Sequence, residues 1–332
     1  MKKKNKFRKE ELSFDEKWEL IKRNTVEIVG EEEFKEFLSN KKEISVYCGY
    51  EPSGPMHLGH FATILKLMDL NRAGIKVKIL LADLHAFLNH KGDQKEISRE
   101  VLRWKKIIKA VGFSNAEIIL GSNFQFTKEY QLDVLKLAQK VTIQRGIRGM
   151  QEISRGGESS TISQLLYPLM QVADIKHLNS EVALGGLEQR KVHMVGKDLS
   201  LILNHNFIAI HTPLITSLKG PGQKMSKSLP GSGISVVDDY EEIKKTINGA
   251  YCPEGEINEN PLLQICKLIL FPKFKNLEIK RPVKFGGNIL LKDYFELEKI
   301  YSEKKVHPLD LKLCVIEYLE KLISPIRKNY LK

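Results

Sequence analysis

Short apolar runs alternate with amphipathic segments along the first 120 residues of the chain. The strand candidates are residues 44–49, 76–82 and 116–120, and the helix candidates between them are residues 58–70 and 95–111. The second helix candidate carries one apolar stripe that includes Ile97, Val101 and Trp104. This order of elements predicts a parallel sheet with right-handed crossovers and helices on both faces, and such sheets bind ligands beyond the carboxyl ends of their strands.

The two ends of the chain depart from this pattern. Ser13 and Glu16 have the spacing of a capping box, which predicts the start of the folded body, and the lysine-rich residues before them predict a disordered tail over residues 1–12. After residue 237 the strand signals fade, and the helix candidates are residues 239–247, 261–270 and 308–326. The sequence therefore predicts an α/β domain over residues 13–237 and a smaller all-α domain over residues 238–332.

Composition narrows the class of protein. The 332 residues include 53 Lys and Arg against 41 Asp and Glu, and this net charge of +12 favours a polyanionic partner such as nucleic acid, although a lysine-rich solvated surface explains it equally well. The four cysteines, Cys48, Cys252, Cys266 and Cys314, form no C-x-x-C pair, so we expect neither a disulfide framework nor a structural metal. Without a membrane-length apolar run or a signal peptide, we expect a cytoplasmic protein.

Two histidines occur between the first predicted strand and the helix that follows it, in the string His57-Leu58-Gly59-His60. At such a junction the backbone amides and the positive end of the helix face the ligand, and the imidazoles can donate hydrogen bonds to phosphate oxygens. Gly59 leaves room for a flat ring to approach the backbone. A surface pair or part of a metal site is the alternative, so this string predicts a nucleotide site only in combination with a second signal.

The second signal is the string Lys224-Met225-Ser226-Lys227-Ser228. It lies in a glycine-rich loop that can close over a triphosphate, with two lysines to meet the phosphates. The glycines of this loop are Gly220, Gly222, Gly231 and Gly233. By itself the string is more typical of an exposed basic loop, because it lacks the spacing of a Walker loop, but the two strings together favour ATP binding.

In this order and at this spacing the two strings resemble the HIGH and KMSKS signatures of class I aminoacyl-tRNA synthetases. Residues 46–54 (VYCGYEPSG), 167–174 (YPLMQVAD) and 185–191 (GGLEQRK) look more closely like tyrosyl-tRNA synthetases of the archaeal and eukaryotic type, and the resemblance covers about residues 15–330. It implies a Rossmann-like catalytic domain with a connective insertion over residues 13–237, then an anticodon-binding domain over residues 238–332. It also implies ATP with Mg²⁺, L-tyrosine and tRNA(Tyr) as substrates, and a homodimer.

The resemblance assigns substrate contacts residue by residue. Tyr47 and Asp174 match positions that hydrogen-bond the phenol of the substrate, a group that both donates and accepts. The other matches on the tyrosine side are Tyr167, Gln171 and Gln189 around the amino group, with Gly49 and Glu51 lining the same pocket. The ATP contacts implied are His57, Gly59, His60, Met225, Ser226 and Lys227, and the catalytic residues implied are His57, His60, Lys224 and Lys227.

Each of these residues also has a purely structural interpretation. Tyr47 could be an ordinary half-buried strand residue, and Asp174 a salt-bridged acid at the edge of a helix. Their joint placement relative to the histidine and lysine strings favours the interpretation that these residues line a substrate pocket.

For tRNA, the resemblance points to Arg148 and Arg190 as readers of the first base pair of the acceptor stem. Arginine can bond guanine edges in a bidentate way, and phosphate contact is the alternative. Phe285 and Asp310 match positions that stack on and hydrogen-bond the anticodon. Without the resemblance, Phe285 is a loop anchor and Asp310 an acid at a helix N-terminus.

Two positions depart from the archaeal and eukaryotic pattern. That branch often has serine where this chain has Lys227, and Ala173 occupies a variable position beside the recognition aspartate. The nearest rival is a tryptophanyl-tRNA synthetase, whose indole substrate has only a donor and does not suit the pair of Tyr47 and Asp174. Two more distant rivals are an RNA-binding module without catalysis and a nucleotidyltransferase of the wider HIGH superfamily.

Overall fold

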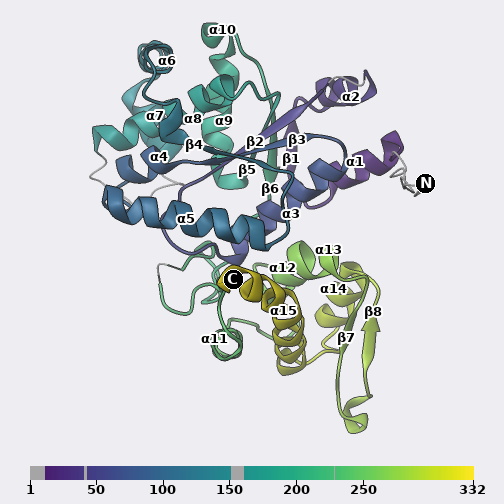
Figure 1. Cartoon of the computed structure of the whole chain (residues 1–332). Coiled ribbons are helices and arrows are strands. Elements are labelled where there is room, and N and C mark those ends of the chain that lie inside the picture. Colours follow the sequence, from purple (N-terminus) through teal and green to yellow (C-terminus); the bar gives the residue numbers. More distant parts are fainter. Residues whose placement is uncertain (1–11, 41–42, 151–160, 228) are drawn as a thin grey trace, which may run out of the picture.

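A six-stranded sheet forms the centre of the molecule (Figure 1). The computed structural model describes residues 12–40, 43–150, 161–227 and 229–332, so the predicted tail before residue 12 and Ser228 lie outside the described residues. The sheet order is β1-β6-β5-β2-β3-β4, and every neighbouring pair is parallel except β1 and β6. The strands are β1 (Glu27–Val29), β2 (Ser45–Tyr50), β3 (Lys76–Leu81), β4 (Glu117–Leu120), β5 (Val182–Gly186) and β6 (Ile208–Thr212).

The three strands that the apolar runs predict are confirmed as β2, β3 and β4, within one residue at each end. The prediction omits β1, β5 and β6. Strand β1 is only three residues long, and β5 ends in Gly185 and Gly186, so neither gives a strong strand signal. The antiparallel edge strand β1 is therefore an addition to the parallel sheet that the sequence predicts.

Alternate residues of the central strands face opposite layers of the molecule. Val46 and Cys48 of β2 pack in the core that includes helices α3 (Leu58–Arg72) and α5 (Gln94–Ala110). Tyr47 between them packs on the other side, with Ile175 of α8 (Ile162–His177). This follows from the two-residue period of a strand. It turns Tyr47 toward the helix that carries Asp174.

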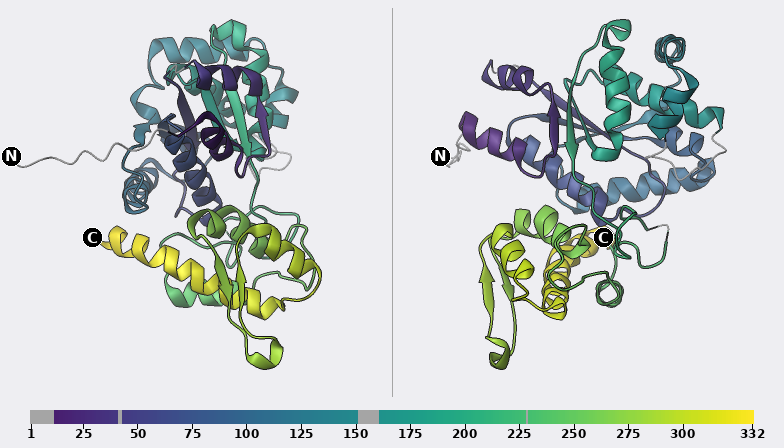
Figure 2. Two further views of the ribbon diagram at one scale, coloured as in Figure 1. Left: turned by 90° about the vertical axis from the view of Figure 1, so that its right-hand side faces the viewer. Right: turned by 180° about the vertical axis from the view of Figure 1, so that it is seen from behind.

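Helices cover both faces of this sheet, as Figures 1 and 2 show. Helices α3 and α5 cover one face, and α8 and α9 cover the other. The first helix starts at the predicted capping box of Ser13 and Glu16. The remaining helices and turns of this sheet body are α1 (Phe14–Lys22), α2 (Glu31–Ser39), α4 (Asp83–Leu88), η1 (Gly121–Asn123), α6 (Lys128–Ala138), α7 (Ile143–Met150), η2 (Leu187–Gln189), α9 (Arg190–Asp198) and α10 (Ser200–Leu203).

The elements from α11 onward, here called the C-terminal body, lie below the sheet body in Figure 1 and are mainly helical, as expected. They are α11 (Tyr240–Asn248), α12 (Pro261–Ile265), the π-helical turn η3 (Cys266–Leu270), α13 (Phe271–Lys273), β7 (Leu277–Ile279), η4 (Val283–Phe285), β8 (Ile289–Leu291), α14 (Tyr294–Ser302) and α15 (Pro308–Leu331). The antiparallel hairpin of β7 and β8 is absent from the all-α prediction. Its strands have three residues each, which is too short to leave a clear period-two pattern.

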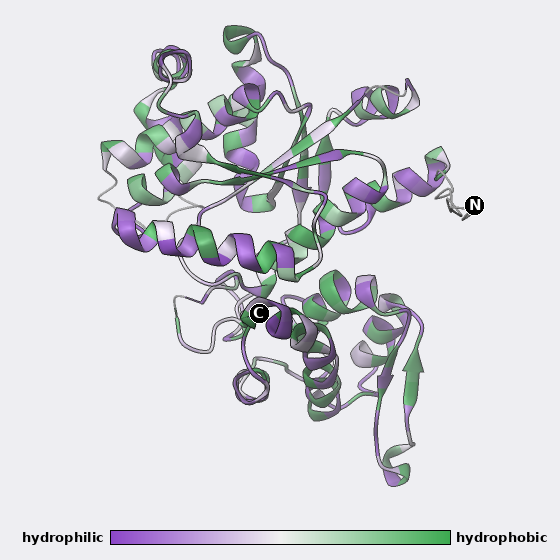
Figure 3. Ribbon diagram, viewed as in Figure 1, coloured by the Kyte–Doolittle hydropathy of each residue, from purple (hydrophilic) through white to green (hydrophobic). Residues whose placement is uncertain are grey.

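The two bodies share one apolar core. Helix α12 and turn η3 contribute buried residues to the same cluster as α3, and α15 packs against α5. Near the end of α15, the ammonium of Lys106 on α5 lies 5.8 Å from the ring centroid of Tyr330. Figure 3 shows apolar residues of α12 and α3 at this junction. Among the described residues, no helix has both the length and the apolar character needed to span a bilayer.

Candidate active site

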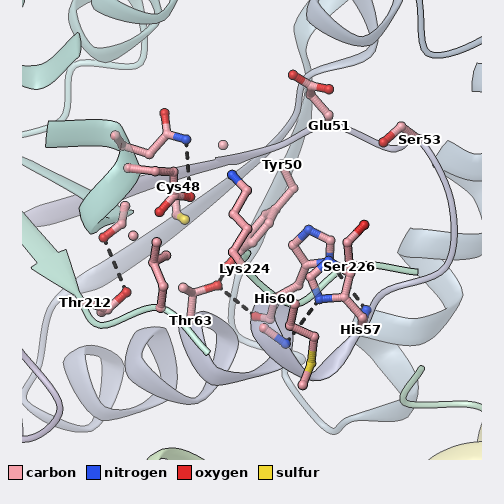
Figure 4. Close-up of a pocket in the computed structure, with 18 of the residues that line it drawn as sticks. Cys48, Tyr50, Glu51, Ser53, His57, His60, Thr63, Thr212, Lys224 and Ser226 are labelled. Carbon is pink, nitrogen blue, oxygen red and sulfur yellow. Dashed lines mark hydrogen bonds between the residues drawn. The ribbon is translucent and has the colours of Figure 1, made fainter. Parts of the chain in front are cut away.

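A cavity of about 1020 Å³ opens at the carboxyl ends of β2, β3, β5 and β6, beside the lysine string (Figure 4). Its walls include most of the predicted tyrosine and ATP contacts, namely Tyr47, Gly49, Glu51, His57, Gly59, His60, Tyr167, Gln171, Gln189, Lys224, Met225, Ser226 and Lys227. Asp174 is fully buried and interacts with the wall residues Tyr47 and Tyr167. Residues that lie far apart in the sequence therefore meet around one cavity.

His57 and His60 open helix α3 as a stacked pair with ring centroids 3.7 Å apart. His57 is the N-cap residue, and its Nδ1 accepts a hydrogen bond from the Gly59 amide at 3.1 Å. The Nδ1 of His60 accepts from the His57 amide at 3.4 Å. A Cβ atom at position 59 would lie 3.0 Å from the His57 ring, so any larger residue there would press on the capping ring.

These hydrogen bonds decide what the histidines can do. Because Nδ1 accepts from a backbone amide, the proton of each neutral ring belongs on Nε2. Burial lowers the pKa of His60 well below its ordinary value, and the neighbouring His57 and Lys224 lower it further. His60 is therefore neutral near pH 7. A neutral ring with a proton on Nε2 is suited to donate a hydrogen bond to a phosphate oxygen.

Backbone hydrogen bonds fold the lysine loop back on itself. The Ser217 amide donates to the Gln223 carbonyl at 2.7 Å, and the Met225 amide donates to the Ile215 carbonyl at 2.7 Å. The Met225 side chain is 3% exposed and packs in the main core, so it anchors the loop as well as lining the cavity. Lys224, between these two backbone contacts, acts electrostatically on both His60 and Glu51.

The segment after the loop is paired with the histidine segment. The Leu58 amide donates to the Ile234 carbonyl at 2.9 Å, and the Val236 amide donates to the Met56 carbonyl at 3.0 Å. This short antiparallel contact holds the two signature strings side by side, as Figure 4 shows for His57, His60, Lys224 and Ser226. The arrangement gathers two imidazoles and two lysines where a triphosphate could bind.

Lys227 differs from Lys224 in its contacts. Its ammonium lies 2.7 Å from Oδ2 of Asp238, which also accepts a hydrogen bond from the Ser235 amide at 2.8 Å. The backbone carbonyl of Asp238 in turn accepts from Arg327 of α15 at 2.5 Å. Lys227 lines the cavity while being held by a carboxylate beside it.

One carboxylate is buried at the inner end of the cavity. Oδ1 of Asp174 accepts hydrogen bonds from the Tyr130 hydroxyl and the Gln125 side-chain nitrogen, both at 2.8 Å. Burial raises the pKa of Asp174 to about 7 against the opposing effect of these two bonds. Oδ2 has no hydrogen-bond partner among the described residues. Since an unpaired buried carboxylate oxygen is unfavourable, the geometry suits a ligand that donates to Oδ2.

His85 approaches the same oxygen. The Gln125 nitrogen lies 3.3 Å from Nδ1 of His85 and donates to it, which places the imidazole proton on Nε2. That Nε2 is 3.5 Å from Oδ2 of Asp174 and also lacks a partner within the described part of the chain. Burial lowers the pKa of His85 to about 3, so the contact is no ion pair. A donor and an acceptor thus lie side by side, which complements a hydroxyl group.

Tyr47 borders this end of the cavity from strand β2 and is 2% exposed. Burial raises its pKa well above the ordinary value and the charge of Asp174 raises it further, so its phenol stays protonated. A Cβ atom at Gly49 would lie 2.6 Å from the Tyr47 hydroxyl oxygen. Glycine at position 49 therefore leaves the space that this phenol occupies.

Polar groups line the middle of the cavity. Burial raises the pKa of Glu51, while hydrogen bonds from Tyr167 and Asn89 and the charge of Lys91 oppose the shift. Oε1 of Gln171 and Oε2 of Glu188 are buried without a hydrogen-bond partner among the described residues. These acceptors are suited to an ammonium or hydroxyl group of a ligand.

Several residues of the site are absent from the sequence-based predictions. His85 follows the carboxyl end of β3, where ligands of parallel sheets bind, so that rule could have found it. Glu188 lies inside the string GGLEQRK, but the family resemblance of this string assigns no contact to Glu188. Gln125 and Tyr130 occur in no motif, and only the folded chain brings them to Asp174.

The predicted tRNA contacts lie outside the cavity wall. Arg190 opens α9 directly after Gln189, and Arg148 is exposed on α7, which contacts α9. Phe285 is 61% exposed in the connection between β7 and β8, at the bottom of Figure 1, and Asp310 lies in the first turn of α15. Two candidates therefore belong to the sheet body and two to the C-terminal body.

Comparison with known proteins agrees with this arrangement. Residues 39–324 match the family model described as tRNA synthetases class I (W and Y). The tyrosine–tRNA ligase of Methanocaldococcus jannaschii is 46% identical over 315 residues, which cover 95% of this chain and 99% of that protein. The corresponding ligase of Archaeoglobus fulgidus is 43% identical over 321 residues, which cover 96% of this chain and 98% of that protein. The chain belongs to the tyrosyl-tRNA synthetase family.

A solved structure of this family has the same fold. The crystal structure of tyrosyl-tRNA synthetase complexed with L-tyrosine from Archaeoglobus fulgidus superimposes with a TM-score of 0.91 at 43% identity, and the match covers 96% of this chain and all of that one. Membership of the tyrosyl-tRNA synthetase family removes the nucleotidyltransferase alternative. The identity of these relatives also separates the chain from the tryptophan branch.

Proposed function

We infer that this chain activates L-tyrosine with ATP, forming tyrosyl-adenylate and pyrophosphate, and then transfers tyrosine to the 3′ end of tRNA(Tyr). The observation that carries this inference is the buried, unpaired Oδ2 of Asp174, with Nε2 of His85 3.5 Å from it, both among the described residues. A phenol hydroxyl would donate to the carboxylate and accept from the imidazole or from Tyr47. Phenylalanine would leave these buried groups unpaired, so its binding is disfavoured.

The cavity gives the substrate one productive direction. With the phenol at Asp174, the amino group of tyrosine would lie among Tyr167, Gln171 and Gln189, with Gly49 and Glu51 lining the same space. The carboxylate would then point toward the histidine and lysine strings. ATP would occupy that outer end, against Gly59, Met225 and Ser226.

Activation needs no general base. The carboxylate of tyrosine is ionised near neutral pH and attacks the α-phosphate of ATP, while the bond from that phosphorus to the bridging oxygen of pyrophosphate breaks. Negative charge grows on the leaving pyrophosphate. His57 and His60 would stabilise this charge through Nε2 protons, and Lys224 and Lys227 through their ammonium groups.

Magnesium enters this proposal as a part of the ATP substrate. No group of three or more His, Cys, Asp or Glu side chains among the described residues is placed to hold a metal ion. We assign the Mg²⁺ of the reaction to the phosphates of ATP, where it would neutralise charge.

In the second reaction a ribose hydroxyl of the terminal adenosine of tRNA attacks the carbonyl of tyrosyl-adenylate and releases AMP. We assign Arg148 and Arg190 to the first base pair of the acceptor stem, because arginine can donate two parallel hydrogen bonds to guanine. Phe285, exposed in the hairpin of the C-terminal body, is suited to stack on an unpaired anticodon base, and Asp310 to bond to one. We propose that the C-terminal domain that carries them begins near residue 238, as the sequence predicts.

We further propose that the protein works as a homodimer in the cytoplasm, where its tRNA is used. Exposed apolar side chains support a dimer surface on α6 and α10, two helices in contact with each other. Leu132, Leu135 and Leu201 are 49%, 59% and 93% exposed there. Exposed apolar residues on helices that contact each other are typical of a protein interface. Light scattering of the purified protein would give the oligomeric state.

The test is the exchange of labelled pyrophosphate into ATP without tRNA, with tyrosine, tryptophan and phenylalanine offered separately. We expect exchange with tyrosine alone. Exchange with tryptophan alone would assign the chain to the sister activity. A folded sample that binds ATP but exchanges with no amino acid would favour a noncatalytic RNA-binding protein.

A further inference from the structure

Glu27 on the edge strand β1 connects two elements of the sheet body. Its Oε2 accepts a hydrogen bond from Nε of Arg190 at 2.7 Å, and its Oε1 accepts from Nη2 of Arg190 at 2.9 Å. On the sheet, Glu27 is paired in register with His211 of β6, whose Nδ1 lies 3.1 Å from Oε2. One carboxylate therefore ties the first residue of α9 to the neighbouring strand.

The contacts continue into the core. His211 and His193 of α9 are both fully buried, and Nε2 of His211 lies 3.0 Å from Nδ1 of His193. Burial lowers the pKa of His193 to about 3, and it lowers the pKa of His211 against the opposing charge of Glu27, so both rings are neutral near pH 7.

The direction of these hydrogen bonds follows from Glu27. A carboxylate can only accept, so His211 donates its Nδ1 proton to Glu27 and accepts at Nε2 from His193. Both imidazole protons in the chain are directed toward Glu27. These hydrogen bonds, from His193 to His211 and from His211 to Glu27, fix the Glu27 carboxylate beside the guanidinium of Arg190.

The guanidinium itself is accessible from solvent. The side chain of Arg190 is 46% exposed, and that of Glu27 is 31% exposed. A guanidinium has five N–H donors, of which Glu27 takes two along one edge. The opposite edge keeps the Nη1 group and one Nη2 hydrogen. This second edge is a parallel donor pair of the kind that bonds O6 and N7 of guanine.

We propose that Glu27 is a positioning residue for tRNA selection. It holds Arg190 with the outer guanidinium edge directed to the first base pair of the acceptor stem, and the chain of His211 and His193 holds Glu27 in place. The proposal rests on the function inferred above, in which Arg190 contacts the acceptor stem. An arginine fixed in advance loses less conformational entropy when RNA binds. Glu27 therefore acts on tRNA recognition and leaves tyrosine activation unchanged.

The variant Glu27→Gln keeps the side-chain length but loses the charged, two-point contact with Arg190. Each sample is assayed for tyrosine-dependent pyrophosphate exchange and for aminoacylation of two tRNA transcripts. The transcripts carry the tyrosine anticodon and differ only in the first base pair, C–G or G–C. We expect unchanged exchange, a kcat/KM for the preferred transcript that is roughly 5- to 20-fold lower through KM, and a smaller preference between the transcripts.

Two further variants separate positioning from general effects. Glu117→Gln is the matched control, because Glu117 lies on the opposite edge strand β4 and pairs with Lys76 at 3.8 Å. It should leave both reactions unchanged. Arg190→Ala should show the same tRNA defect, and the addition of Glu27→Gln to Arg190→Ala should cause no further loss.

The outcomes that overturn the proposal are distinct. Unchanged aminoacylation and unchanged transcript preference in Glu27→Gln would show that Glu27 does not position Arg190. Faster charging would show that Glu27 restrains Arg190, and a loss of exchange would show that it acts through the fold. If the wild-type protein shows no tyrosine-dependent exchange, the proposed function itself fails, and this result is independent of any Glu27 variant.

Discussion

The inner and outer ends of the cavity are built in different ways. At the inner end, Asp174 is fully buried, and Gln125, Tyr130 and His85 surround it in a fixed arrangement of donors and acceptors. At the outer end, Lys227 is 23% exposed and its main contact is one carboxylate, Asp238. The inner end is buried and its donors and acceptors complement one hydroxyl, whereas the outer end has donors suited to a large anion.

Because of this difference, we expect the inner end to select the amino acid and the outer end to affect the rate of reaction. A buried, unpaired carboxylate oxygen discriminates strongly, because any ligand that fails to pair it leaves a charge without a donor at low dielectric. In the proposed complex several partly exposed donors would share the charge of a triphosphate, so the removal of one should have a smaller effect. Substitutions at the inner end should therefore change which amino acid is activated. Substitutions at the outer end should change the rate of activation.

The largest effect is expected from Asp174→Asn. The amide oxygen can still accept from Tyr130 and Gln125, but the acceptor proposed for the phenol's hydrogen bond is lost, so tyrosine-dependent exchange should fall roughly 1000-fold. The folded pKa of Asp174, about 7, is raised above the ordinary value, so its ionisation destabilises the ligand-free protein as pH rises. Thermal melts at pH 8 should therefore show a higher Tm for the variant.

Asp133 provides the matched control for this variant. Burial opposes the shift, but hydrogen bonds from Lys176, Lys136 and His177 lower the pKa of Asp133 to about 2. A depressed pKa contributes stability above pH 4, so Asp133→Asn should lower Tm at pH 8 and leave exchange nearly unchanged. Equal exchange in the two variants would show that Asp174 has no special part in tyrosine binding.

The next largest effect is expected from Lys227→Ala. If the Lys227 ammonium stabilises the leaving pyrophosphate as proposed, its loss should lower kcat for exchange about 100-fold, with the KM for tyrosine nearly unchanged. Lys219→Ala is the control, because Lys219 is exposed in the same loop region and does not line the cavity. If Lys227→Ala raised the KM for tyrosine instead of lowering kcat, the division between the two ends would be wrong.

A smaller effect should follow from pH. In the proposed complex, ionised Asp174 accepts a hydrogen bond from the phenol, so we expect tyrosine to bind best above the pKa of this carboxyl, which is about 7 in the ligand-free protein. As pH falls from 8 to 6 the carboxyl becomes protonated, and the KM for tyrosine should rise about 10-fold. The profile of Asp174→Asn should be flat over this range. A flat profile in the wild type would contradict the ionised-acceptor account.

The smallest effect is expected from Asp238→Asn. Lys227 must release or share Asp238 to reach a triphosphate, and a partly exposed ion pair contributes about 1 kcal/mol or less. The KM for ATP in the exchange assay should therefore fall about 2- to 5-fold. The amide oxygen can still accept from the Ser235 amide. A higher KM would mean that Asp238 directs Lys227 toward ATP.

The same contrast explains what the sequence could predict. The outer end is encoded in two short strings, so His57, His60, Lys224 and Lys227 could be named from local patterns. The inner end depends on contacts across long sequence separations, such as Gln125 and Tyr130 with Asp174, and no local pattern records them. The central strands and helices follow from hydrophobic period. The short hairpin of β7 and β8 leaves too few residues for that signal.

The most direct test of this account is a crystal structure with L-tyrosine and a nonhydrolysable ATP analogue. We expect the phenol oxygen at hydrogen-bond distance, about 2.6–3.2 Å, from Oδ2 of Asp174. We also expect the triphosphate to lie against His57, His60 and the two lysines of the loop. A tyrosine whose phenol points toward the lysine loop, or an Asp174 that stays unpaired in the complex, would contradict it.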